Sequence, residues 1–179
     1  TAGVGFLLAE KWVESVVEIN RISDRICTIK INVGASILTV LSVYAPQSGL
    51  DERTKDAFYD LLQCTVAKST GSECLFVCGD LDGHIGSEST VYDGVHGGFG
   101  YGKRNIEGER ILEFSIANDF VICNSFFQKR NSHLVTFQSG GASTQVDYIL
   151  TRKCHFKLVR NVKVIPNEEC VSQHKLLVC

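Results

Sequence analysis

The sequence predicts an α+β domain in which two packed, mainly antiparallel β-sheets are flanked by helices. Short segments rich in Val, Ile, Leu and Thr, with partial alternation of apolar and polar residues, dominate the chain and are typical of strands. Two segments carry apolar residues at helical spacing instead. The two periods do not alternate in a regular strand-helix-strand pattern, which argues against a parallel α/β fold.

The first part of the chain predicts strands followed by a helix. Short breakers separate four segments that we interpret as consecutive antiparallel strands, at residues 4–9, 15–22, 25–33 and 36–44. After Pro46 the period changes, and Phe58, Leu61 and Leu62 recur at helical spacing. Asp51 is a suitable N-cap, and we expect this helix to end near residues 69–71.

The second part predicts more strands and one further helix. Residues 74–78 form an apolar run, and a glycine-rich loop follows to about residue 105. A helix is predicted over residues 106–117, with Ile111, Leu112, Ser115 and Ile116 facing inward. The remaining predicted strands are at residues 120–123, 134–137, 144–150, 156–165 and 175–179.

Size and composition indicate a single globular domain over residues 1–179. The chain is 44% hydrophobic and 21% charged, and its formal net charge is −2, so nucleic-acid binding would require a local basic patch. Its longest apolar runs are far shorter than the ~18 residues of a membrane span. With no secretory signal visible, we expect an intracellular protein, nuclear or cytoplasmic, that is not secreted and has no membrane partner and no evident obligate protein partner.

The cysteines indicate reduced thiols. All eight are spread through the chain, mostly within apolar runs, where cysteine behaves as a small apolar residue: Cys27, Cys64, Cys74, Cys78, Cys123, Cys154, Cys170 and Cys179. A zinc site at Cys74 and Cys78 with His84 and His96 is the alternative. The two histidines are too far apart for a zinc finger, and the cysteines lie on a predicted strand.

Two acids follow the predicted strand 74–78. Asp80 and Asp82 lie between Gly79 and Gly83, so flexible backbone surrounds both carboxylates and could approach a ligand closely. The same residue types also favour a simple solvated Asx turn.

A third acid and a histidine complete a possible hydrolytic centre. Asp147 lies within the apolar run 145–150, so it is either exposed on a strand or buried with a partner. His174 precedes the last apolar run, and a carboxylate can orient a histidine and stabilise its charged form. An exposed aspartate and an unrelated surface histidine remain the alternative.

The glycine-rich loop contains a near-match to a phosphate-binding loop. Gly97 and Gly102-Lys103 have the required spacing, but Arg104 stands where Ser or Thr is needed, and no buried strand precedes the motif. We therefore interpret the segment as a basic loop whose Lys103 and Arg104, with Lys129 and Arg130, could contact phosphates.

In order along the chain, these motifs resemble those of the endonuclease/exonuclease/phosphatase superfamily. The matching segments are Val43-Tyr44-Ala45-Pro46, Gly79-Asp80-Leu81-Asp82, Gln145-Val146-Asp147-Tyr148-Ile149 and Ser172-Gln173-His174. The closest resemblance is to the apurinic-type endonuclease domain of non-LTR (LINE-like) retrotransposons and to craniofacial-development-protein-like sequences. Residues 21–25, 100–105 and 107–114 resemble that branch specifically.

The resemblance implies a four-layer α/β/β/α sandwich and a magnesium-dependent phosphodiesterase that cuts DNA. It implies that Asp80 orients or deprotonates the attacking water and that residue 82 hydrogen-bonds the phosphate or that water. It further implies that His174, oriented by Asp147, stabilises charge on the phosphoryl oxygens, with help from Tyr44. The branch-specific loop suggests substrate binding by Lys103, Arg104 and Asn105.

Three departures from the family pattern limit these expectations. The family's metal-binding Glu and an Asn of its first strand would lie before Thr1, so we expect an N-terminally truncated domain without the first strand and helix. Asp82 replaces an Asn, which should raise the pKa of one carboxylate, and Gln173 replaces an Asp of the wider superfamily. We therefore expect Mg²⁺ binding in an intact parent domain, weak or no activity in this piece, and poor solubility from an exposed sheet edge.

Two other functions remain open at this stage. A decayed or repurposed copy could act as a non-catalytic binding module. A phosphatase of the same superfamily would share the motifs.

Overall fold

The computed structural model describes residues 3–171 and 173–179, with backbone only for residues 169–171. Its larger sheet has the strand order β1-β2-β3-β4-β8-β5. These strands are β1 (Val16–Arg21), β2 (Ile26–Asn32), β3 (Ile37–Tyr44), β4 (Cys74–Asp80), β8 (Asp147–Arg152) and β5 (Phe120–Ile122). The smaller sheet has the order β7-β6-β10-β9, formed by β7 (Ala142–Thr144), β6 (Phe137–Ser139), β10 (His174–Val178) and β9 (Lys163–Val171).

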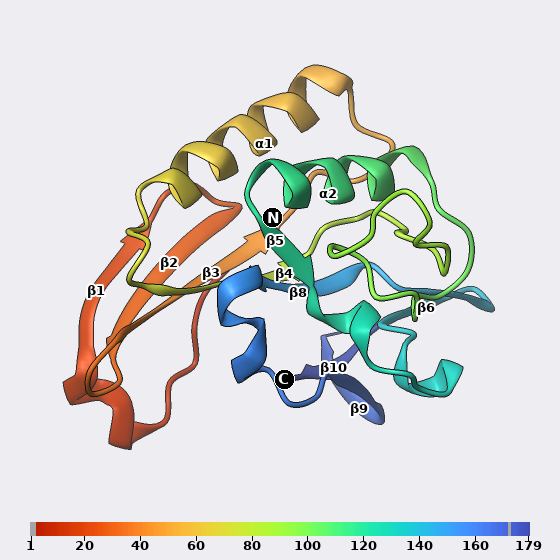
Figure 1. Ribbon diagram of the computed structural model, residues 1–179. Coiled ribbons are helices and arrows are strands. Elements are labelled where there is room, and N and C mark those ends of the chain that lie inside the picture. The colour runs from red at the N-terminus through yellow and green to blue at the C-terminus, as the bar shows by residue number, and fades with distance from the viewer. Residues whose placement is uncertain (1–2, 172) are drawn as a thin grey trace.

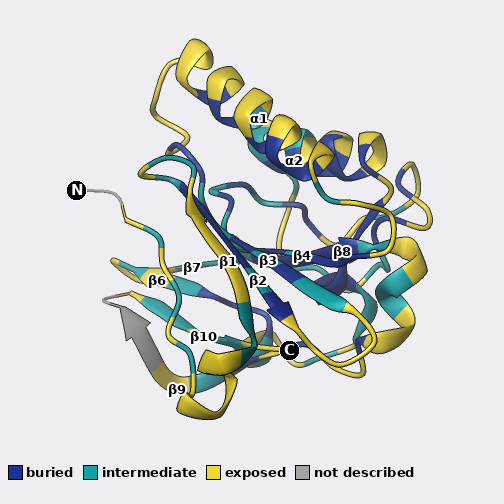
Figure 2. Ribbon diagram, turned by 90° about the vertical axis from the view of Figure 1, so that its left-hand side faces the viewer, coloured by how far each residue is buried: buried dark blue, intermediate teal, exposed yellow. Residues whose placement is uncertain are grey.

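Two α-helices lie side by side on the same face of the six-stranded sheet (Figure 1). They are α1 (Glu52–Ala67) and α2 (Ile106–Ala117), and short 3-10 helices occupy η1 (Glu10–Ser15), η2 (Cys123–Phe126), η3 (Asn131–His133) and η4 (Lys153–Leu158). The four-stranded sheet packs against the opposite face (Figure 2). The predicted α+β class with two packed sheets is therefore confirmed.

Both helices begin at side-chain caps. The Asp51 carboxylate accepts a hydrogen bond from the Thr54 amide at 2.9 Å, and the Asn105 side chain accepts one from the Gly108 amide at 2.8 Å. The inward faces are largely as predicted, because Ile111, Leu112 and Ser115 of α2 are fully buried. Ile116 is exposed, which corrects its prediction: one position beyond Ser115, it turns about 100° away from the buried stripe.

Two apolar cores hold the layers together. The first lies between the helices and the six-stranded sheet, where Leu62 and Ile111 meet Leu75 and Tyr148. The second lies between the sheets, where Ile149 and Val162 pack with the half-buried Phe156. Exposed residues are concentrated on the outer sides of the helices and along β1 (Figure 2).

Four predicted strands differ in the structure. The strand predicted at residues 144–150 is divided between the end of β7 at Thr144 and β8, which begins at Asp147 in the other sheet. Residues 4–9 form no strand, since no neighbouring strand among the described residues pairs with them, and Leu7 is fully exposed. In the predicted strand 134–137, only Phe137 belongs to a strand (β6). The predicted strand 156–165 divides into η4 and the start of β9, because Phe156 turns inward onto the ring of Phe126 instead of continuing an alternating pattern.

The strand order places two parallel strands at the centre of the large sheet. β3 and β4 run parallel and are connected through α1, while β8 runs antiparallel to β4. The carboxyl ends of β3 and β4 and the amino end of β8 therefore meet at one end of the sheet. No helix among the described residues has the length and apolar character needed to cross a membrane.

Candidate active site

Three polar residues form a row across the end of the six-stranded sheet. Tyr44 of β3 is the register partner of Asp80 of β4, and Asp80 is the partner of Asp147 of β8. Register partners project from the same face of a sheet, so all three side chains point to the side that faces the smaller sheet. Sequence positions more than a hundred residues apart are thereby brought into one row.

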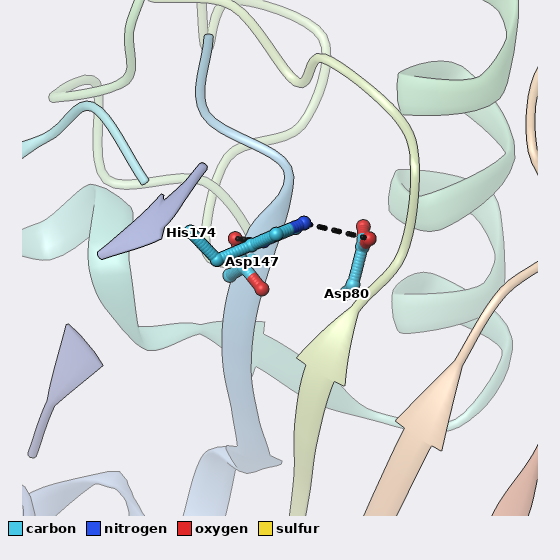
Figure 3. A group of neighbouring side chains, drawn as sticks. All are labelled: Asp80, Asp147 and His174. Carbon is cyan, nitrogen blue, oxygen red and sulfur yellow. Dashed lines mark hydrogen bonds and ion pairs between the residues drawn. The ribbon is translucent and has the colours of Figure 1, made fainter. Parts of the chain in front are cut away.

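His174 reaches this row from the smaller sheet. As the first residue of β10, it lies beside Phe137 of β6, with 4.8 Å between the ring centroids. Its Nδ1 donates to the Asp147 carboxylate at 3.1 Å, and its Nε2 lies 3.9 Å from an Asp80 oxygen (Figure 3). The structure therefore brings together three of the four residues of the hydrolytic interpretation, Asp80, Asp147 and His174, while the side chain of Asp82 lies apart from them.

The charges of this group depend on one another. Burial, reinforced by the negative charge of Asp147, raises the pKa of Asp80 to about 7. The hydrogen bond to Asp147 is the main cause of a raised pKa of His174, and the charges of Asp147 and Asp80 add to it. The site therefore contains an acid that can exchange its proton near neutral pH beside an imidazole that favours its charged form.

Two buried residues hold Asp147 in place. The Thr136 hydroxyl accepts hydrogen bonds from the backbone amides of Val146 and Asp147, at 3.0 and 3.1 Å. The Asn124 side chain donates to the Asp147 carbonyl at 3.1 Å and accepts from the Ile149 amide at 2.9 Å. The sequence did not predict these roles of Thr136 and Asn124, because the residues around them show no pattern that indicates contacts with Asp147.

The glycines beside Asp80 serve packing within the protein. Gly79 has φ +149°, and a Cβ there would lie 1.9 Å from the Val43 carbonyl oxygen. A Cβ at Gly83 would lie 2.6 Å from the backbone of Glu107 at the start of α2. Both glycines therefore let neighbouring backbone approach the loop that carries Asp80.

Asp82 takes a separate position. Its backbone is in the left-handed region at φ 46°, its amide donates to the Asp80 carboxylate at 2.9 Å, and its own carboxylate accepts from the Ser48 amide. Burial raises the pKa of Asp82. Asp82 is thus connected to Asp80 through the backbone, while its side chain faces the turn before α1.

Tyr44 lines a cleft that runs between the two sheets. The cleft has a volume of about 1040 Å³, and Asp80, Asp147 and His174 share its wall with apolar residues such as Leu176 of β10. A cleft with a few convergent polar groups on an apolar wall is the usual form of a ligand site.

The three residues suggested for substrate binding lie on the loop before α2. Arg104 donates to the Ile85 carbonyl at 3.2 Å and stacks on the Tyr92 ring at 4.6 Å, while Asn105 caps α2. Lys103 is exposed. Arg104 and Asn105 therefore have roles within the fold, and binding of substrate by these residues stays a prediction.

The described cysteines are free thiols and the glycine-rich segment is a loop, while phosphate binding by its basic residues stays a prediction. Cys170 lies outside the described side chains. The nitrogens of His96 are engaged by the Gly86 carbonyl and the Gly98 amide, at 3.0 and 2.9 Å. The segment from Gly97 to Lys103 is a loop that follows no strand directly.

Three residues of the cleft could supply part of the ligand set of a divalent cation. One ligand atom each from Asp80, Asp147 and His174 lie within 4.8 Å of one another. Two carboxylates of adjacent strands are the oxygen donors that Mg²⁺ prefers. Burial is the main cause of the raised pKa of Asp80, and a bound cation would offset the repulsion from Asp147 that adds to it. The group is therefore a candidate metal site.

The chain is similar to known proteins in sequence and in fold. No family model matches the chain. Craniofacial development protein 2 of Bos taurus is 32% identical over 178 residues, which is 98% of this chain and 30% of that protein. The chain thus spans about a third of the length of the curated relatives it matches.

Two solved structures share the fold at low sequence identity. The endonuclease domain of TRAS1, a telomere-specific non-LTR retrotransposon, has a TM-score of 0.61 at 16% identity, over 87% of this chain and 62% of that one. The 3′ phosphatase NExo from Neisseria, bound to a product DNA hairpin, also has a TM-score of 0.61, at 14% identity, over 87% of this chain and 63% of that one. This chain therefore has the fold of the endonuclease/exonuclease/phosphatase superfamily, and along nearly its whole length it is similar in sequence to craniofacial development protein 2.

Proposed function

We propose that the cleft hydrolyses phosphodiester bonds of DNA with the help of Mg²⁺. The observation that carries the proposal is the convergence of Asp80, Asp147 and His174 in one cleft of a nuclease-like fold. Two of the solved structures with this fold, the TRAS1 domain and NExo, are described as an endonuclease and as an enzyme bound to DNA.

The chemistry assigns one task to each group. Asp80, with a pKa of about 7, accepts a proton from the attacking water near neutral pH. His174, held by Asp147 and favoured in its charged form, presents Nε2 to the oxygens that gain negative charge. Tyr44 faces the same cleft from β3. Bound Mg²⁺ beside Asp147 would supply positive charge next to the phosphate.

A plasmid-nicking assay with Mg²⁺ tests this function. Replacing Asp80 or His174 by Asn should lower the nicking rate roughly 100-fold or more, as expected for a lost general base or charge stabiliser. Asp60→Asn, an exposed acid on α1, is the matched control and should change nothing. Because Asp82 adds negative charge, we expect the unmodified chain itself to be slow, so each rate is read relative to it.

The assay also separates the alternatives. Nicking that persists in EDTA or in Asp80→Asn would overturn the proposal. DNA binding without any nicking would favour a binding module. Release of phosphate from a 3′-phosphorylated oligonucleotide, without nicking, would favour a phosphatase, as the similarity to NExo suggests.

A further inference from the structure

One segment with the branch-specific pattern, residues 21–25, has no role in the site so far. Its last residue, Arg25, lies directly before β2 and beside the end of β3. We infer that Arg25 is a positioning residue that fixes Tyr44 at the mouth of the cleft. The inference rests on the proposed function, and its test includes a readout that does not require activity.

Arg25 contacts Tyr44 in three ways. Its Nη1 donates to the carbonyls of Tyr44 and Ala45, each at 3.1 Å. Its guanidinium carbon lies 5.1 Å from the centroid of the Tyr44 ring. The Tyr44 amide in turn donates to the Arg25 carbonyl at 2.9 Å. One side chain thus holds both the backbone and the ring of Tyr44.

The turn that Arg25 holds is connected to Asp80 at the end of β4 and to Asp82 in the loop that follows. The Ala45 amide donates to the Asp80 carbonyl at 2.8 Å. Three residues further on, the Ser48 amide donates to the Asp82 carboxylate. A shift of the turn at residues 44–48 would therefore move Tyr44 and the backbone of Asp80 together.

The charge of Arg25 is directed at this turn. Among the described residues, no carboxylate forms an ion pair with it. Arg25 is also not one of the residues that line the cleft, whereas Tyr44 is. Its effect on a substrate in the cleft therefore passes through the residues it holds, Tyr44 directly and Asp80 by way of Ala45. A lysine has no planar group to stack on the ring while donating to two carbonyls, so Arg25→Lys should not replace it.

The first test observes Tyr44 directly. In the full chain labelled with ¹⁹F-tyrosine, the Tyr44 resonance is identified by its loss in Tyr44→Phe. Arg25→Ala and Arg25→Lys should both shift that resonance and leave the other tyrosines unchanged. Arg21→Ala, an exposed arginine on neighbouring β1, is the control and should leave it in place. An unshifted Tyr44 resonance in Arg25→Ala, or a wild-type resonance in Arg25→Lys, would overturn the inference.

The second test uses the nicking reaction. Arg25→Ala should lower kcat roughly ten- to hundredfold with KM unchanged, as expected for a misplaced group. In a Tyr44→Ala background the same change should have a much smaller effect, since only the backbone link through Ala45 to Asp80 is then lost. A raised KM with unchanged kcat, or an additive loss in the double variant, would mean that Arg25 acts on its own and would refute positioning. If the wild-type chain shows no nicking, that result bears on the proposed function alone, and the tyrosine resonance decides the role of Arg25.

Discussion

At the scale of single residues, the cleft brings the carboxylates of Asp80 and Asp147 close together where both are largely buried. Asp80 and Asp147 are register partners on adjacent strands, and only His174 among the described residues forms an ion pair with either of them. The side chains of Asp80 and Asp147 are 14% and 18% exposed, so water screens their repulsion only in part. The site therefore costs the folded protein stability, and pH should change that cost.

The first prediction concerns this pH dependence. The pKa of Asp80 rises from 3.8 to about 7 on folding, so between these values the folded state binds more protons and stability falls as pH rises. The raised pKa of His174 acts in the same direction, since its contribution is lost as pH rises through the folded value. Asp80→Asn should thus stabilise the protein by about 1–3 kcal/mol at pH 8 and by almost nothing at pH 4.

Urea unfolding in EDTA at the two pH values measures this difference. Asp60→Asn on the exposed face of α1 is the control and should show no pH-dependent gain. Equal stability of Asp80→Asn and wild type at pH 8 would show that folding does not raise the pKa of Asp80.

The second prediction concerns Asp82. An Asn at this position keeps the acceptor for the Ser48 amide, tolerates the left-handed backbone, and removes one negative charge beside Asp80. Asp82→Asn should therefore tighten binding of a DNA duplex by roughly two- to tenfold at low salt. Fluorescence anisotropy measures this, with the exposed Asp24→Asn as the control. Unchanged affinity would mean that bound DNA does not sense the charge of Asp82.

At the scale of elements, the caps of the two helices differ: among the described residues, only the cap of α2 also binds a residue outside its own helix. In the described part of the chain, the Asp51 carboxylate accepts hydrogen bonds only within its own first turn, from the amide and hydroxyl of Thr54. The Asn105 side chain also accepts a hydrogen bond from the His84 amide at 2.8 Å, so it connects α2 to the loop that follows Asp80. Loss of the Asn105 cap should thus disturb the loop that follows Asp80 as well as the start of α2.

The third prediction compares these caps. Asn105→Ala should cost about 2 kcal/mol of unfolding free energy, because it leaves two amides without an acceptor, whereas Asp51→Ala should cost about 1 kcal/mol. Guanidinium unfolding of both variants gives the comparison. A cost for Asn105→Ala no larger than that for Asp51→Ala would show that the bond to His84 adds no stability.

At the scale of the whole molecule, the free edge of the large sheet is its least protected part. β1 is the outermost strand, and Val17 and Ile19 on it are 59% and 60% exposed. An edge strand with exposed apolar side chains can pair with another chain and promote aggregation. The poor solubility expected from the sequence stays a prediction. If it is observed, the exposed edge at β1 is the first surface to test.

The fourth prediction uses a cross-strand pair at this edge. Ile19 of β1 and Ile29 of β2 are register partners, yet Ile29 is only 2% exposed. Ile19→Lys should reduce aggregation and change the melting temperature little, whereas Ile29→Lys should unfold the domain, since it buries an unpaired charge. Light scattering and thermal melts distinguish the two. Aggregation that is unchanged in Ile19→Lys would exclude β1 as its cause.

Local patterns were sufficient for most of the secondary structure. Helical spacing predicted α1 and α2 within a few residues, with Asp51 as the N-cap of α1, and the apolar run before Asp80 predicted β4. These signals lie within one turn or one strand. The strand predicted at residues 4–9 failed for a related reason. A strand requires a partner, and its own sequence cannot supply one.

The sequence alone determined the residue types of the site, their order along the chain and the resemblance that connects them to phosphodiester chemistry. Only the tertiary structure decided that Asp80 and Asp147 share a row, that His174 arrives from the other sheet, and that Thr136, Asn124 and Arg25 lie behind them. The physical reason is that strand register and sheet packing join positions far apart in sequence. Such contacts depend on the whole fold and leave no mark in the local pattern.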